Sequence, residues 1–256
     1  HAICVGERGV VFAGFSDLGK RQELYLQPLA GGPAQGLPGA AERQWRDAKA
    51  DNACARLLVT RSAWGQPPAL SLQTLGQAGA ISLAGDAPSP DLAAYANQPQ
   101  PLALMAADGR TPLNAFYFAA RTAAGARHPV IVMAYGGPGA NECNNQWEFG
   151  DYFWHQLLCQ EGYIVACVDN RGTQGRGRDF KHSTYMQLGK LETIDQIETA
   201  KYLGGLSYVD KNRIGFQGWS FGGYMASLLI TKGADYFKSC VAVAPVRLLL
   251  LQNLSP

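Results

Sequence analysis

A short glycine-rich motif constrains the fold of this chain more than any other feature. Gly218-Trp219-Ser220-Phe221-Gly222 has the form G-x-S-x-G, with the β-prone run Arg213–Gln217 directly before it and the apolar helical run Tyr224–Ile230 directly after it. The bare string is common, but this strand–turn–helix context is that of a nucleophile elbow. Side chains at positions 218 and 222 would collide with the neighbouring strand and helix. The sequence therefore predicts a tight turn that presents the Ser220 hydroxyl as a nucleophile.

The second half of the chain alternates between strand-like and helical segments. Strand-like runs occur at 130–135, 163–169, 213–217 and 239–243, and helical stretches at about 147–161, 190–204 and 222–232. Strands that alternate with helices of this length form a parallel sheet with right-handed crossovers. We therefore expect an α/β fold with a doubly wound parallel sheet of the α/β-hydrolase kind, with Ser220 at its carboxyl edge.

Three acidic residues follow one another along the second of these helices. Glu192, Asp195 and Glu198 recur at i, i+3 and i+6. Charged side chains at this spacing usually line the solvent face of an amphipathic helix. We expect a solvated face here rather than a pair of catalytic carboxylates.

A second glycine-rich segment ends the first strand of the predicted sheet. Tyr135-Gly136-Gly137-Pro138-Gly139 begins 85 residues before Ser220, where an α/β-hydrolase places its second oxyanion donor. Lipases and esterases carry His-Gly-Gly at this point, whereas this chain has a tyrosine in front of the glycines. A tyrosine at a strand end is by itself more often a packing residue. Together with the Ser220 motif, the favoured interpretation is that the Tyr135 hydroxyl is an oxyanion donor.

The first 86 residues form a different kind of pattern, with short β-strands between Gly/Pro turns. Residues 23–29 (ELYLQPL) resemble residues 69–75 (ALSLQTL) at an offset of 46 positions. Propeller blades repeat every ~40–50 residues, so this stretch fits one or two blades, or else two strands that are alike by chance. Four prolines within 87–101 indicate a linker. A hairpin of 102–106 with 113–118 is expected to follow it.

The composition excludes several classes of partner and cofactor. There are 22 Lys and Arg against 20 Asp and Glu, a net charge of +2, which gives no electrostatic reason to bind nucleic acid. The six cysteines contain no CxxC pair, which argues against zinc-ribbon and thioredoxin-type sites. Buried thiols are the expected state of these cysteines, with an oxidised pair left open. We expect no metal and no cofactor.

Several motifs together resemble a known family. The Tyr135 and Ser220 segments occur in order with Asp169-Asn170-Arg171-Gly172, Leu188-Gly189-Lys190, Asp195-Gln196 and Val243-Ala244-Pro245-Val246. This set resembles the dipeptidyl peptidase IV branch of the prolyl oligopeptidase family, in its bacterial form, closely over about 102–246. In that family a β-propeller covers an α/β-hydrolase domain, and the enzyme removes Xaa-Pro or Xaa-Ala dipeptides from peptide N-termini.

The resemblance implies roles for individual residues. Ser220 would be the nucleophile, and the Phe221 backbone N–H and the Tyr135 hydroxyl would form the oxyanion hole. Trp219, Phe221 and Val246 would line the substrate pocket. It also implies a domain division into 1–86 (the last propeller blade or blades), the linker 87–101 and a truncated peptidase domain 102–256.

The resemblance extends to partners and location. The substrate would be a peptide with Pro or Ala in second place, and a homodimer of the full-length enzyme is compatible with the family. A periplasmic or cell-envelope location is favoured, with the cytoplasm left open. The family's paired glutamates that bind the substrate amine have no counterpart in these residues.

The chain departs from the family at the catalytic triad. In α/β-hydrolases the order along the chain is Ser, then Asp or Glu, then His, but all four histidines precede Ser220 and only Asp235 follows it as an acid. We therefore expect these 256 residues by themselves to be an inactive, C-terminally truncated fragment of such an enzyme. Two alternatives stay open: an acylaminoacyl peptidase or esterase on the same fold, and a non-catalytic interaction module.

Overall fold

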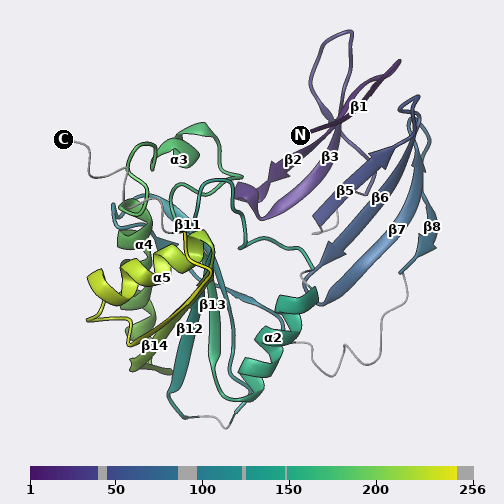
Figure 1. Ribbon diagram of the computed structural model, residues 1–256. Helices are drawn as coiled ribbons and strands as arrows, with labels where there is room; N and C mark the ends of the chain where they lie inside the picture. Colours follow the sequence, from purple (N-terminus) through teal and green to yellow (C-terminus); the bar gives the residue numbers. More distant parts are fainter. Residues whose placement is uncertain (40–44, 86–96, 123–124, 148, 247–256) are drawn as a thin grey trace. The chain divides into compact units, whose positions relative to one another are not determined.

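The computed structural model describes residues 1–39, 45–85, 97–122, 125–147 and 149–246, and these fall into two compact units (Figure 1). The first unit comprises His1–Gln98 together with Asn144–Tyr152, and the second comprises Pro99–Cys143 and the chain from Phe153 onward. Most of the predicted linker, residues 87–96, lies outside the described residues, as does the leucine-rich tail 247–256.

The first unit contains two four-stranded antiparallel sheets, each with its strands in sequence order. The first sheet consists of β1 (Ala2–Gly6), β2 (Gly9–Ser16), β3 (Arg21–Gln27) and β4 (Gln35–Gly36), and the second of β5 (Trp45–Ala50), β6 (Arg56–Ala63), β7 (Gln66–Thr74) and β8 (Ile81–Ala84). The similar segments 23–29 and 69–75 fall largely on β3 and β7, the third strand of each sheet. The sequence repeat is therefore a structural repeat, and two such sheets fit two propeller blades.

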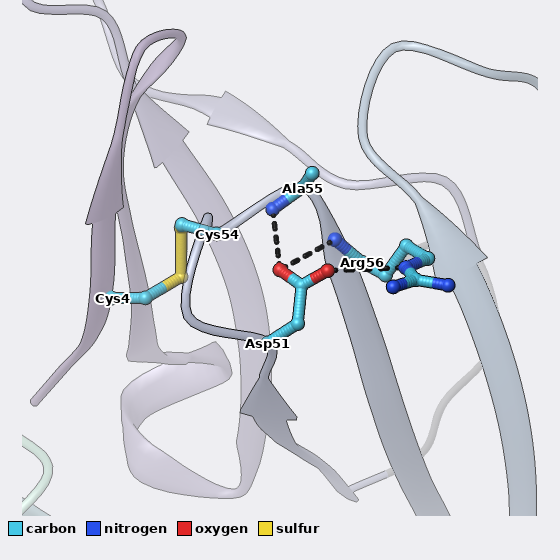
Figure 2. Close-up of a disulfide and its surroundings, with 5 residues drawn as sticks. All are labelled: Cys4, Asp51, Cys54, Ala55 and Arg56. Atoms are coloured by element: carbon cyan, nitrogen blue, oxygen red, sulfur yellow. Dashed lines mark hydrogen bonds and ion pairs between the residues drawn. A yellow bond between two sulfur atoms is a disulfide. The ribbon is translucent and has the colours of Figure 1, made fainter.

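A shared apolar core and one disulfide join these two sheets. The core is built from buried side chains of both sheets, among them Val11, Leu24, Leu57, Val59 and Leu75. Cys4 on β1 is bonded to Cys54 in the turn between β5 and β6, across a separation of 50 residues (Figure 2). The oxidised pair that the sequence left open is therefore present.

The turn that carries Cys54 is held by an aspartate. Asp51 accepts hydrogen bonds from the backbone N–H groups of Ala55 and Arg56, and from Arg56 Nε (Figure 2). These bonds hold the pKa of the Asp51 carboxyl below its ordinary value, with the Ala55 N–H making the largest contribution. The turn thus has a fixed shape on which the Cys54 thiol can reach β1.

The first unit also includes a segment from much later in the chain. Asn145 donates its N–H to the Lys20 carbonyl at 2.8 Å and accepts the Trp64 N–H at 2.9 Å. The Trp147 N–H donates to the Ser62 hydroxyl at 3.2 Å. Asn145 and Trp147 therefore pack with the two β-sheets although they lie between β12 and β13 in sequence.

The second unit is a mixed sheet with helices. Its strands are β9 (Gln100–Pro101), β10 (Leu104–Met105), β11 (Pro112–Phe118), β12 (His128–Met133), β13 (Ile164–Asp169), β14 (Val209–Trp219) and β15 (Ser239–Val243). The main order is β10-β11-β13-β12-β14-β15, with β9 beside β11. Strands β13, β12, β14 and β15 are parallel, as predicted, and β10 forms the expected antiparallel hairpin with β11.

Four helices accompany this sheet along the chain. They are α2 (Phe149–Gln160), α3 (Arg178–His182), α4 (Leu191–Gly204) and α5 (Phe221–Lys232). Helices α4 and α5 both contact β14, and the core contains Val130, Val132, Ile164, Phe216, Met225 and Leu229. None of the helices in the described ranges is long and apolar enough to cross a membrane.

The predicted solvent face of α4 is wrong. Glu192 and Asp195 are both fully buried, and of the three acids only Glu198 is partly exposed. Asp195 is buried because it has partners: Arg171 donates to it through Nε and Nη2, and the Ala107 N–H donates at 3.0 Å. An ion pair with additional backbone donors satisfies a carboxylate that burial would otherwise destabilise.

Candidate active site

Ser220 lies on a tight turn between β14 and α5. Its backbone has φ +56° and ψ −109°, a region that residues other than glycine rarely adopt. The Ser220 N–H donates to the Val243 carbonyl at 2.9 Å, and its carbonyl accepts the N–H groups of Tyr224 and Val246. The Ser220 hydroxyl does not cap the helix that it precedes. Backbone hydrogen bonds therefore fix the turn, and the Ser220 hydroxyl is not needed to hold it.

The two glycines of the motif are required by close packing, as predicted. A Cβ on Gly218 would overlap the backbone of Gly222, lying 2.6 Å from its Cα. A Cβ on Gly222 would overlap the carbonyl oxygen of Ala134 and lie 3.2 Å from the Tyr135 Cα. Gly218 thus lets the turn close on α5, and Gly222 lets α5 approach the end of β12.

The first turn of α5 provides hydrogen-bond donors beside Ser220. The first intrahelical bond runs from the Tyr224 N–H to the Ser220 carbonyl, so the N–H groups of Phe221, Gly222 and Gly223 have no acceptor within the helix. These groups carry the positive end of the helix dipole. An anion that forms on a substrate bonded to Ser220 would be stabilised there.

Tyr135 lies next to this turn. The Gly222 contact brings the Tyr135 backbone against α5, and the Tyr135 ring stacks on the Phe221 ring with centroids 6.0 Å apart. The two glycine-rich segments, 85 residues apart in sequence, therefore meet at one end of the parallel strands.

The loop after Tyr135 is fastened to β13 through two carboxylates. The Tyr135 N–H donates to Glu142 Oε2 at 2.6 Å. The N–H groups of Glu142 and Cys143 donate to Asp169 at 3.2 and 2.9 Å. Burial raises the pKa of Asp169 to about 6, against the two backbone bonds that lower it. Sequence reasoning missed Glu142, because its partner is the backbone of a residue seven positions earlier.

Asn170 holds the glycine that follows Tyr135. Its Nδ2 donates to the Gly136 carbonyl at 2.8 Å, and its Oδ1 accepts a bond from Gln196 on α4. Gly136 has φ +72°, and a Cβ there would lie 2.7 Å from the Asn170 side chain. The Asp169-Asn170-Arg171 motif thus positions the Tyr135 segment and connects it to α4.

The other predicted pocket residues are in different environments. Trp219 is 66% exposed, whereas Phe221 is buried with its ring edge-on to Tyr224. Val246 is half-buried and packs against the core of the second unit. Trp219 and Phe221 are the chain neighbours of Ser220. Val246 lies beside the turn because its N–H donates to the Ser220 carbonyl.

Two of the four histidines that precede Ser220 lie on helices. His155 on α2 is buried with its ring 5.6 Å from the Phe118 ring, and His182 at the end of α3 is exposed. Among the residues with described coordinates, no group of three or more His, Cys, Asp or Glu side chains is arranged to hold a metal ion.

Comparison with known proteins agrees with this geometry. Residues 147–255 match the model of the prolyl oligopeptidase family. Over 125 residues the chain is 35% identical to dipeptidyl peptidase 8 of Mus musculus. The matched stretch covers 48% of this chain and 14% of that protein. These matches support a member of the prolyl oligopeptidase family.

Two solved structures extend the likeness to nearly the whole chain. The crystal structure of Porphyromonas gingivalis dipeptidyl peptidase 4 matches 96% of it with a TM-score of 0.85 and 29% identity. That of a putative dipeptidyl aminopeptidase IV from Bacteroides ovatus matches 94% with a TM-score of 0.81 and 28% identity. The chain spans 35% and 34% of these two structures. The chain is thus similar to proteins of the dipeptidyl peptidase IV type, and its architecture fits an α/β-hydrolase with propeller strands.

Proposed function

We propose that this chain supplies the nucleophile and the oxyanion hole of a dipeptidyl peptidase. The observation that carries the proposal is the contact between the two motifs: Ser220 stands on a strained turn whose helix touches the Tyr135 backbone through Gly222. A serine nucleophile and oxyanion donors from two separate segments are what acyl transfer requires.

The chemistry follows from the groups gathered here. Ser220 Oγ attacks the carbonyl carbon of the scissile peptide bond and loses its proton to a general base. The Phe221 N–H and the Tyr135 hydroxyl donate to the oxyanion that forms. The tetrahedral intermediate then expels the amine, which takes the proton, and water later releases the acyl group from Ser220.

The proposed substrate is a peptide with Pro or Ala in second place. The residues proposed to receive its small ring or methyl group are the exposed Trp219, the half-buried Val246 and Phe221 at the start of α5. The names of the relatives, dipeptidyl peptidases 4 and 8, support removal of dipeptides.

All four histidines of this sequence precede Ser220, whereas an α/β-hydrolase places its general base after the nucleophile. His155 is packed in α2 and His182 is exposed on α3. Removing a triad base leaves only ~10³–10⁴-fold acceleration over water. We therefore expect these 256 residues, expressed by themselves, to show no measurable turnover.

The proposal is tested on the protein expressed from its whole gene. We expect release of p-nitroaniline from Gly-Pro and Ala-Ala p-nitroanilides, and loss of that activity in Ser220→Ala. Tyr135→Phe should lower kcat about 10²–10³-fold, the usual effect of removing one oxyanion donor. Hydrolysis of N-acetylalanine p-nitroanilide or p-nitrophenyl butyrate in preference to both dipeptides would replace the proposal with an acylaminoacyl peptidase or an esterase. Full activity in Ser220→Ala would overturn it.

A further inference from the structure

Cys143 and Cys167 lie unusually close to each other in the second unit. Their Sγ atoms are 2.6 Å apart, and the two residues are only 3% and 6% exposed. Unbonded heavy atoms in contact normally stay about 3.5–4.0 Å apart, whereas a disulfide is about 2.05 Å long. The separation is therefore much nearer to a bond than to a packing contact.

The backbone explains why these two sulfurs meet. Cys167 lies on β13, which is flanked by β11 and β12 and is therefore held on both sides. Cys143 is fastened to the same strand two residues further on, because its N–H donates to Asp169 Oδ2. Residues two apart on a strand face the same side of the sheet, so a chain anchored at Asp169 can direct its thiol towards Cys167.

We propose that Cys143 and Cys167 form a second disulfide, which fastens the Tyr135–Cys143 loop to β13. Each thiol gives up a proton and the pair gives up two electrons to a disulfide oxidant, which is reduced to two thiols as the new S–S bond forms. The Cys4–Cys54 bond of the first unit requires an oxidant of the same class during folding. The oxidant that forms the Cys4–Cys54 bond can therefore also oxidise Cys143 and Cys167.

The timing of this bond follows from burial. Burial raises the pKa of the Cys143 thiol well above its ordinary value, so the folded protein presents very little thiolate at this position. The bond therefore forms while the loop is still open to solvent, and the closed loop then shields it from attack by external thiols. The other buried cysteine nearby in sequence, Cys159, has the Phe118 carbonyl within 3.8 Å of its sulfur and serves as a matched control.

The test is peptide mapping of the protein expressed from its whole gene. The protein is refolded with reduced and oxidised glutathione, alkylated with iodoacetamide, and digested with trypsin and Glu-C without reduction. These enzymes separate the three cysteines of the region into residues 143–148, 149–161 and 162–171. We expect peptide 143–148 linked to 162–171, and Cys159 alkylated in its own peptide.

The first unit provides an internal control within the same digest. The peptide that contains Cys4 and ends at Glu7, linked to residues 50–56, reports the Cys4–Cys54 bond and hence that oxidation took place. Cys159→Ser should leave the 143–148/162–171 product unchanged, and Cys167→Ser should remove it and leave Cys143 alkylated. Alkylated Cys143 and Cys167 in a sample that contains the Cys4–Cys54 product, or Cys143 linked to any other cysteine, would overturn the proposal.

Discussion

The backbone of Ser220 is the most strained feature of the site. A residue other than glycine in such a conformation costs on the order of 1–3 kcal/mol, and three backbone hydrogen bonds hold it there. Their partners are Val243 on β15, Tyr224 on α5 and Val246. Two of the three bonds therefore involve residues that lie 23 and 26 positions after Ser220, Val243 and Val246, so the strain is stabilised by the tertiary fold as well as by α5.

Glu192 is the residue whose burial is least compensated. Neither of its carboxylate oxygens has a well-aligned hydrogen-bond donor. Burial raises the pKa of Glu192 to about 7, although the backbone N–H groups of Glu192, Gly189 and Lys190 partly lower it. The folded state therefore binds more protons than the unfolded state between about pH 4.5 and 7. Stability falls as the pH rises through that window.

The substitution Glu192→Gln tests this assignment. We expect the variant to match the wild type at pH 5, where Glu192 is protonated in the folded protein. At pH 8 it should be more stable by about 2–3 kcal/mol, because the buried charge is gone. Thermal denaturation from pH 5 to 8 measures the difference, and a variant less stable than the wild type at pH 8 would contradict the assignment.

At the scale of elements, the site depends on how closely α5 approaches β12. Gly222→Ala would force its Cβ against the Ala134 carbonyl and the Tyr135 Cα. The backbone cannot move aside as a side chain can, so we expect a loss of about 2–4 kcal/mol in stability. We also expect loss of the proposed dipeptidyl peptidase activity. Gly205→Ala at the end of α4 is the control, since its nearest neighbour is 3.3 Å away and its φ is −82°. Equal, small effects of both changes in urea unfolding would contradict this account.

The buried ion pair joins α4 to the loop after β13. Asp195 is fully buried and accepts three side-chain hydrogen bonds from Arg171, two from Nε and one from Nη2. Asp195→Asn removes the buried one of the two carboxylates paired with Arg171 and leaves Asp108, 3.2 Å from the arginine's Nη1. Breaking a buried pair costs about 3–5 kcal/mol, and we expect a loss at the lower end of that range. Glu198→Gln, one helical turn later, breaks only the exposed pair with Lys201 and should cost under about 0.5 kcal/mol. Urea unfolding of both variants measures the contrast, and similar losses would show that Arg171 does not need Asp195.

The elements of the second unit were largely predictable because each parallel strand is a short apolar run with a helix after it. The 239–243 strand matches β15 residue for residue, and α5 begins one residue before its predicted start. The burial of Asp195 was not predictable, because its partners Ala107 and Arg171 are 88 and 24 residues away. Spacing along a helix reports periodicity and carries no information on distant cations.

At the scale of the whole molecule, the first unit is a repeat joined by a covalent bond. The 46-residue offset was visible in the sequence because the third strand of each sheet carries leucines at alternate positions. Their burial differs, since Leu24 is fully buried and its equivalent Leu70 only partly. The Cys4–Cys54 pairing was not predictable, since six cysteines allow many connectivities. It required the fold to bring β1 and the β5–β6 turn together.

The disulfide has a measurable consequence for the first unit. A bond that closes 50 residues lowers the entropy of the unfolded chain enough to stabilise the fold by about 4 kcal/mol. In the double variant Cys4→Ser/Cys54→Ser, amides of β2 and β6 should exchange with solvent about 10³-fold faster. Hydrogen exchange read by mass spectrometry localises the effect, and Cys240→Ser in the second unit is the control. Unchanged exchange on β2 and β6 would show that the apolar core alone determines the stability of this unit.

The account's central claim is that Ser220 is the nucleophile, and covalent labelling of the protein expressed from its whole gene tests it most directly. A fluorophosphonate reacts with a serine that a base has activated, and trypsin places Ser220 in the peptide of residues 214–232. We predict one label per chain, located on Ser220 in that peptide, absent from Ser220→Ala and slowed in Tyr135→Phe. Hydrolysis of Gly-Pro p-nitroanilide by a protein whose Ser220 stays unlabelled, or a label on another residue that abolishes the activity, would contradict the claim.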